Sequence, residues 1–473
     1  MGAKKGRVRT GGAKIESPAA NAATGDSTTV ALTPEPVTPV PPAAPPEKKP
    51  SGFGMLVLHL HPKMVPEEAL ALPRTFGLGG MALLLLLVLV CTGALLLFVY
   101  DPSPEKAYAS ILNLEGHVPF GAFVRAVHHW AANGLIVVAF LHLLRVFFTG
   151  GFRAPRGFNW VLGLIMLFLV TASNFTGYLL PWDQLSFWAV TIGTGMLAYV
   201  PLVGEALQNA LRGGSEVGAK TLSVFFVLHI AILPILAFLL AAFHFWLVRK
   251  AGGVLLPAQV EGAPRRTLVP ARPNLVLREG TVALVLLAVL LLFAALVPAP
   301  LQEQANPGMS PNPAKAPWYF MGVQELLVHL HPSFAVFVVP LLVLAFFASL
   351  PYFKYGEPHS GRWFHSETGE RAALRATVAA LVVTPAYVVA SEYVLRWPKL
   401  LPFLPQPVSN GLVPTLLWIG IVAGVYWLAA RFFKASRIEA VQAVFAFMIV
   451  AFLVLTATGI FFRGESMHLS WPW

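Results

Sequence analysis

The stretch AVHHWAANGLIVVAFLHLLRVFF, residues 126–148, decides the fold of this chain. It is long and apolar enough to cross the ~30 Å hydrocarbon core of a bilayer as a helix. A second stretch, FFVLHIAILPILAFLLAAFHFWLVRK at 225–250, has the same character. Ionisable residues inside membrane spans are costly and therefore mark functional sites. Four of the histidines in these two stretches have matched positions: His128, His142, His229 and His244.

The spacing of these histidines predicts two facing pairs. His128 and His142 are 14 residues apart, and His229 and His244 are 15 apart. At ~100° and ~1.5 Å per helical residue, the two members of each span point roughly to one face and lie ~21 Å apart along the axis. One complete span separates the two stretches, so they run parallel. The pattern predicts two stacked bis-imidazole sites with about 20 Å between metal ions.

Two imidazoles on one heme leave no open position at the iron, so such a heme only transfers electrons. Two stacked hemes would make an electron path across the membrane. The opposing interpretation is that each histidine is a satisfied polar residue of a helix bundle. Burying four imidazoles at matched spacing without ligands would be costly, which favours heme binding.

Composition agrees with a membrane protein. Of 473 residues, 56% are hydrophobic and only 12% are charged, with a net charge of +11, and a soluble globule needs more surface charge than this. The only cysteine, Cys91, lies in an apolar run and is interpreted as a small core residue. A single cysteine excludes a disulfide framework, a thiolate zinc site and an iron–sulfur cluster within this chain.

We therefore predict an all-α, polytopic transmembrane protein of about nine spans, with a four-helix di-heme bundle in its N-terminal half. The expected spans lie near 78–100, 123–148, 158–180, 221–248, 280–298, 334–351, 373–394, 411–432 and 440–462. Lys and Arg concentrate in the alternate loops 149–157, 249–279, 352–372 and 433–439. The positive-inside rule makes these loops and the N-terminus cytoplasmic. A bacterial inner-membrane location is expected.

Residues near the histidines suit a heme but also have plainer explanations. Arg125 and Arg145 lie one turn beyond the pair on the first stretch and could bind propionates or snorkel to the membrane surface. Gly79 and Gly93 before it, and Gly163 and Gly177 after it, could admit a flat macrocycle. Glycines of membrane helices also serve close helix packing.

Longer motifs carry a family resemblance. AVHHW, LHLLRVF-x-TGGFRAPR, TGYLLPWDQLSFWAV and the second histidine stretch resemble cytochrome b of the quinol–cytochrome c oxidoreductases and their photosynthetic counterparts. The match runs from about residue 70 to about residue 350. It implies that His128 and His229 hold an outer heme and that His142 and His244 hold an inner heme, both of b type and non-covalent.

The resemblance also implies two quinone sites. An outer quinol-oxidising pocket would be built from 176–190, with Pro181 and Trp182, and from APWYFMGVQEL at 316–326, with Tyr319. An inner quinone site would lie near Arg249, which also fits a positive-inside anchor. The implied partners are a Rieske iron–sulfur protein, a c-type cytochrome, the quinone pool, membrane lipid and a second copy of the complex. No nucleic acid is expected.

Composition, the order of the spans and the resemblance together predict a domain division. We expect a disordered Pro/Ala-rich cytoplasmic tail, the di-heme domain, a cytoplasmic linker, a C-terminal domain with the quinol-site loop, and additional spans without an assigned role. These are residues 1–53, 54–250, 251–279, 280–400 and 401–473. The segment 54–72 could form an amphipathic helix on the inner surface.

Two departures from the family matter. Its outer pocket carries Pro-Glu-Trp-Tyr, whereas this chain has Pro317 at the place of the acid. Quinol oxidation releases protons that a titratable group must collect, and Glu325 is the candidate, alone or with Tyr319, His329 or His331. The alternative is that Glu325 is a solvated acid.

The second departure is Gly77, which occupies the position of the cysteine that holds a covalent third heme in the photosynthetic form. We therefore expect two hemes and no covalent third one.

The predicted function is that of a respiratory quinol oxidoreductase subunit. Quinol would send one electron to the Rieske protein and one across the membrane to the inner quinone site, and proton translocation would accompany this transfer. One alternative is a di-heme anchor that conducts electrons to a partner oxidoreductase without bifurcation. Another is a transporter whose histidines relay protons.

Overall fold

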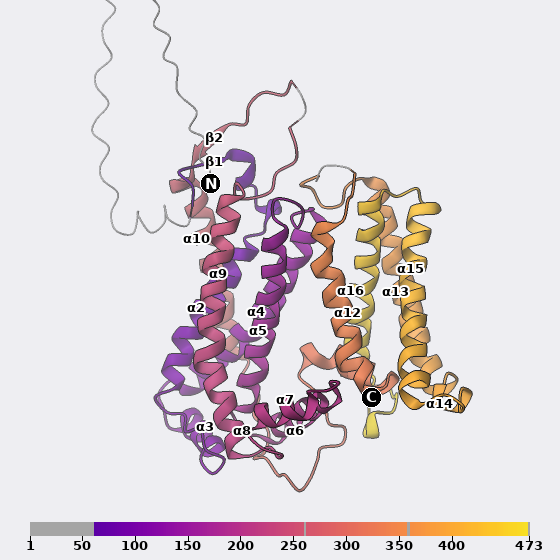
Figure 1. Ribbon diagram of the computed structural model, residues 1–473. Helices are drawn as coiled ribbons and strands as arrows, with labels where there is room; N and C mark the ends of the chain where they lie inside the picture. The colour runs from indigo at the N-terminus through magenta and orange to yellow at the C-terminus, as the bar shows by residue number, and fades with distance from the viewer. Residues whose placement is uncertain (1–60, 260–261, 357–359, 472–473) are drawn as a thin grey trace, which may run out of the picture. The chain divides into compact units, whose positions relative to one another are not determined.

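The computed structural model describes residues 61–259, 262–356 and 360–471. Within these ranges nine helices are long and apolar enough to span a bilayer, and Figure 1 shows them as the long ribbons. The all-α polytopic fold is therefore confirmed. The predicted tail, residues 1–53, lies outside the described residues.

Four spans form the N-terminal bundle. They are α2 (Leu78–Leu96), α4 (Gly121–Phe148), α5 (Gly157–Leu179) and the continuous α8 (Ala219–Val227), η4 (Leu228–Ile232) and α9 (Leu233–Lys250). Helix α2 packs on α4, and α5 packs on both α4 and α9. The fifth span, α10 (Ala271–Leu296), covers α2 and α4 through a shared apolar cluster.

Three spans contain a widened, π-helical turn. These turns are η4, η6 (Phe334–Val338) and η8 (Val408–Leu412), and Pro234, Pro340 and Pro414 follow them. Proline has no N–H to donate and its ring presses on the preceding turn. The helix therefore widens locally, and a π turn holds about one residue more than an α turn.

The C-terminal half is built around the last span. Helices α12 (Val339–Ser349), α13 (Glu367–Tyr393), α15 (Val413–Arg431) and α16 (Arg437–Phe461) form it, and short α14 (Trp397–Leu400) follows α13. Helix α16 contacts α11, α13 and α15. Of the nine described spans it has the largest buried share, 44% of its most apolar window. The last span is thus central to this half.

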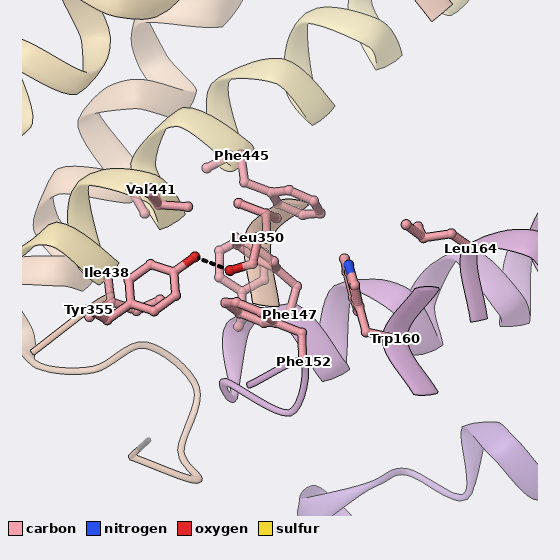
Figure 2. Close-up of a cluster of buried hydrophobic side chains, with 12 residues drawn as sticks. Phe147, Phe152, Trp160, Leu164, Leu350, Tyr355, Ile438, Val441 and Phe445 are labelled. Carbon is pink, nitrogen blue, oxygen red and sulfur yellow. Dashed lines mark hydrogen bonds between the residues drawn. The ribbon is translucent and has the colours of Figure 1, made fainter. Parts of the chain in front are cut away.

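A cluster of aromatic side chains joins α16 to the end of α4 (Figure 2). The Phe147 and Phe445 rings stack with their centroids 3.8 Å apart. The Tyr355 hydroxyl donates a 2.8 Å hydrogen bond to the Leu350 carbonyl beside them. Helix α4 also carries two of the four histidines, so the last span packs against the histidine bundle.

Short elements connect the spans. They are α3 (Ala107–Gly116), α6 (Gln184–Gly195), α7 (Gly204–Arg212), η5 (Trp318–Phe320) and α11 (Met321–His329). Asp183 caps α6, because its side chain accepts a 2.9 Å hydrogen bond from the Ser186 N–H. The loops 181–220 and 299–333 are therefore structured.

Two expectations are corrected, one by a two-stranded sheet and one by the start of α10. Strand β1 (Met64–Pro66) pairs antiparallel with β2 (Leu268–Pro270). The described part of 54–72 is thus strand and 3₁₀ turns, not an amphipathic helix, since Pro62 and Pro66 disfavour a helix there. Helix α10 begins at Ala271 and not near 280, because its first turns are polar and extend beyond the apolar run.

Candidate functional site

The structure brings the four histidines together in two pairs. His128 on α4 faces His229 in η4, with ring centroids 6.1 Å apart and planes at 73°. His142 faces His244 at 6.4 Å and 74°. Two metal–imidazole bonds of about 2 Å each, plus the half-widths of two rings, span about 6 Å. Each pair is therefore spaced to bind one metal ion between its rings.

The unequal spacings within the two spans have a structural cause. The 14-residue interval on α4 is regular helix, whereas the 15-residue interval on the second span begins inside η4. Because a π turn holds about one extra residue, the two intervals cover nearly the same number of turns. Pro234 is the sequence signal for this turn, and treating the span as a regular helix missed it.

A glycine lies beside each imidazole. On α2, a Cβ added to Gly93 would come within 3.3 Å of its ring, and one added to Gly79 within 3.7 Å. On α5, a Cβ added to Gly163 would come within 3.9 Å, whereas one added to Gly177 would overlap its ring. The pairs are Gly93 with His128, Gly79 with His142, Gly163 with His244 and Gly177 with His229. Only Gly177, and less strictly Gly93, is required by its ring, because a Cβ at Gly79 or Gly163 would make an ordinary contact.

Hydrogen bonds determine the tautomer of the outer pair. The Thr92 hydroxyl donates to the Val88 carbonyl at 2.7 Å, so it accepts from His128 Nδ1 at 2.9 Å. His229 Nδ1 lies 2.9 Å from the Ser173 carbonyl oxygen, which can only accept. Both Nδ1 atoms therefore carry the proton, and both Nε2 lone pairs are free to bind metal.

In the inner pair, one imidazole lacks a hydrogen bond at Nδ1. His244 Nδ1 is buried and has no hydrogen-bond partner among the described residues. An orphaned imidazole nitrogen of this kind is costly in an apolar bundle. The inner pair is therefore less tightly oriented by the protein than the outer pair.

The two arginines beside the histidines donate hydrogen bonds to backbone carbonyls of neighbouring segments. Arg125 pairs with Glu115 and donates to the carbonyls of Ala299 and Pro300 at 3.0 and 2.6 Å. Arg145 Nε donates to the Arg74 carbonyl at 2.8 Å. Both arginines are 7% exposed, so snorkelling to the surface does not describe them. Their role toward heme propionates stays a prediction.

Residues 64–252 match the family model of cytochrome b/b6/petB. The cytochrome b6 of Heliomicrobium gestii is 41% identical over 206 residues, which cover 44% of this chain and 96% of that protein. The chain belongs to the cytochrome b/b6 family. A cytochrome bc complex cytochrome b subunit of Chlorobaculum thiosulfatiphilum is 37% identical over 274 residues, covering 58% of this chain and 63% of that protein.

The solved structure of a hyperthermophilic respiratory Complex III has a similar fold. Its TM-score is 0.61 at 22% identity, and the match covers 86% of this chain and 96% of that chain. The likeness therefore extends well beyond the N-terminal bundle. Family membership implies b-type hemes in a multi-pass membrane protein, and the spacing, tautomers and glycine spaces of the histidine pairs fit such hemes.

The two segments expected to form the outer pocket lie together. The rings of Phe175 and Phe320 are 5.5 Å apart and perpendicular. Burial, with the Tyr178 hydroxyl nearby, raises the pKa of Tyr319 above its usual value. Tyr319 therefore stays a neutral phenol, which can donate a hydrogen bond.

Trp318 connects the outer pocket to the histidine helix. Its Nε1 donates a 2.6 Å hydrogen bond to the Asn133 side-chain oxygen on α4. The Asn133 amide nitrogen lies 3.2 Å from His129 Nε2, next in sequence to His128. Sequence reasoning missed Asn133 and His129, because neither forms part of the matched histidine spacing.

Backbone hydrogen bonds bridge the two outer loops. Ala305 N–H donates to the Trp182 carbonyl at 3.1 Å, and Gln184 N–H donates to the Glu303 carbonyl at 2.7 Å. The Trp182 side chain is 6% exposed and packs in an apolar cluster, whereas Pro181 is half-buried. Trp182 therefore packs within the region where the two outer loops meet.

Glu325 is buried in an ionic cluster. It is 0% exposed, so the alternative of a solvated acid is wrong. Arg463 Nε donates to its two oxygens at 3.2 and 3.0 Å, and His329 Nε2 lies 3.0 Å from Oε1. Burial alone would raise the pKa of Glu325, but the hydrogen bonds from His329 and Arg463 hold it below its usual value.

Several other predicted residues are placed more simply. Arg249 is exposed at the end of α9, where its role toward an inner quinone stays a prediction. The His331 and Tyr199 rings lie 6.2 Å apart.

Cys91 is exposed, so its interpretation as a core residue is wrong. Gly77 starts α2 with a left-handed φ of 67°, and a Cβ there would come within 2.9 Å of Val282.

Proposed function

We propose that this chain is the cytochrome b subunit of a respiratory quinol oxidoreductase in the bacterial inner membrane, with its N-terminus in the cytoplasm. The observation that carries the proposal is the geometry of the two imidazole pairs, at 6.1 and 6.4 Å. Both pairs are held on the same two spans, and Trp318 contacts α4, the helix that carries His128 and His142.

When bound, two bis-imidazole b hemes supply one-electron redox centres without an open coordination position. The chain orients the imidazoles through the hydrogen bonds to Thr92 and Ser173. On α2 and α5 a glycine lies beside each of the four rings. The potential of each centre is set by such ligation, hydrogen bonding and burial.

In the proposed reaction quinol releases two electrons and two protons in the outer pocket. One electron goes to a Rieske iron–sulfur protein and then to a c-type cytochrome, since one cysteine cannot build a cluster in this chain. The second crosses the membrane to an inner quinone site near Arg249. Protons leave outside and are taken up inside, so the reaction contributes to a proton gradient. The assembly is proposed to be a homodimer.

The outer pocket is proposed to hold quinol between Tyr319, Pro181 and the region in which Trp182 packs. Glu325 with His329 is the candidate proton acceptor, because these two lie 3.0 Å apart and Pro317 replaces the family's acid. Since Arg463 holds the pKa of Glu325 low, the imidazole would be the member of this couple that takes up the proton. Substitution of Glu325 by Gln should lower quinol oxidation and shift its pH dependence. Full activity with an unchanged pH profile in this variant would refute the role.

A short oxidant pulse on the purified complex tests the whole proposal. With quinol present, bifurcation makes the b-heme absorbance band rise transiently, because the electron left on the semiquinone is passed to the b site. A non-bifurcating anchor would instead show b-heme oxidation after the same pulse. A complex that does not oxidise quinol at all would overturn the proposed function.

A further inference from the structure

A buried arginine connects the last span to the helix behind the outer pocket. Arg463 follows α16 by two residues and is 3% exposed. Besides both Glu325 oxygens, it contacts Glu392 through Nη1 at 2.9 Å and the Met467 carbonyl at 2.9 Å. Such a two-pronged guanidinium–carboxylate contact is directional as well as strong.

The rest of the cluster closes around this contact. His329 Nε2 lies 3.3 Å from Arg463 Nη2, and His329 Nδ1 lies 3.1 Å from the Ser391 hydroxyl. His468, with 79% of its side chain exposed, lies 3.6 Å from the second Glu392 oxygen. The cluster thus joins α11, α13 and the end of α16.

Helix α11 is also packed against α16 without space between them. A Cβ on Gly322 would come within 2.6 Å of Phe452 and 2.8 Å of Thr456, both on α16. Similarly, a Cβ on Gly459 of α16 would come within 2.9 Å of Met321. The position of α11 therefore follows the position of α16.

Immediately before α11 come the three aromatic residues of η5, which contact the other half of the protein. Trp318 reaches Asn133 on α4, and Phe320 reaches Phe175 on α5. Glu325 lies only four positions after Met321, the first residue of α11. A movement at the ionic cluster would thus be transmitted directly to the pocket wall.

We propose that Arg463 is a positioning residue for the outer quinol pocket, which acts through Glu325 to hold α11 and the aromatic residues 318–320 in place. This inference rests on the proposed quinol oxidation. It gives the last span, which lies outside the family match at 64–252, a role in the reaction.

The test is steady-state quinol oxidation by the purified complex with Arg463→Gln and Arg463→Lys. We expect Arg463→Gln to raise the KM for quinol and lower kcat, with kcat/KM falling by up to about 100-fold, as for misplaced binding groups. The b-heme spectrum should be unchanged. Arg463→Lys keeps the charge but loses the fork, so it should recover part of the activity.

Glu439→Gln is the matched control. Glu439 anchors the other end of α16, where it accepts from the Ser366 hydroxyl and from the Ser436 N–H at 2.8 Å. This variant should keep the wild-type KM. An equal rise of KM in Glu439→Gln would overturn the proposal, because general loosening of α16 would then explain both results.

The double variant Glu325→Gln/Arg463→Gln adds a second criterion. If Arg463 acts through Glu325, the double variant should lose no more activity than the worse single variant. Fully additive losses, or wild-type KM and kcat in both Arg463 variants, would overturn the inference. Failure of the wild-type complex to oxidise quinol would instead count against the proposed function.

Discussion

The two halves of the protein place polar groups in the membrane in different ways. In the N-terminal bundle the imidazoles face each other in pairs across about 6 Å, a spacing that suits a metal ion between the rings. In the C-terminal half the charges of Arg463, Glu325 and Glu392 form a closed set of contacts. Since unpaired polar groups are costly to bury, the first arrangement needs a ligand, whereas the second is complete within the chain.

Removal of one imidazole gives the largest expected effect on this comparison. His229→Ala should remove the outer heme and leave the inner one, so the pyridine hemochrome content should fall to about half, because His128 and His229 would hold that heme together. His129→Ala is the matched control, as His129 bonds to Asn133 and not to a partner imidazole. Two intact heme signals in His229→Ala would show that the pairing is wrong.

The second-largest effect is expected when a glycine beside an imidazole is replaced by alanine. Gly177→Ala places a methyl group against the His229 ring, while Gly163→Ala places one 3.9 Å from the His244 ring, an ordinary contact. Overpacking of this kind typically costs about 1–3 kcal/mol. Gly177→Ala should therefore reduce outer-heme occupancy, measured as heme per polypeptide, and Gly163→Ala should not. Equal heme content in both variants would leave the glycines as packing residues.

Sequence alone predicted the first half of this comparison far better than the second. Intramembrane histidines at matched spacing are rare, so they identify their own partners, and the resemblance added the outer loops. Arg463 gave no such signal, because an arginine just after a span is ordinary and its partner Glu325 is distant in sequence. The π turn at 228–232 was within reach of sequence reasoning, since Pro234 follows it directly.

Weakening the C-terminal half should change stability but not heme content. Ser366 caps α13 through its hydroxyl, which accepts from Thr368 N–H at 3.1 Å, and it also contacts buried Glu439. Ser366→Ala should lower the free energy of unfolding by about 0.5–2 kcal/mol, measured by thermal unfolding of the purified complex. Ser360→Ala, a loop serine with weaker contacts of 3.2 Å or more, is the control. Loss of heme in Ser366→Ala would contradict the division between the halves.

The smallest expected effect concerns the orientation of the outer pair. Thr92→Val removes the acceptor of His128 Nδ1 and keeps the side-chain shape, so the outer heme should remain bound while its midpoint potential changes. Thr171→Val is the control, because the Thr171 hydroxyl donates to the Leu167 carbonyl of its own helix. A redox titration with two resolved b-heme waves measures the result. If Thr92→Val moved both waves equally, the change would come from the bundle as a whole. A shift of the outer wave alone is expected, because the Thr92 hydroxyl bonds to His128 of the outer pair.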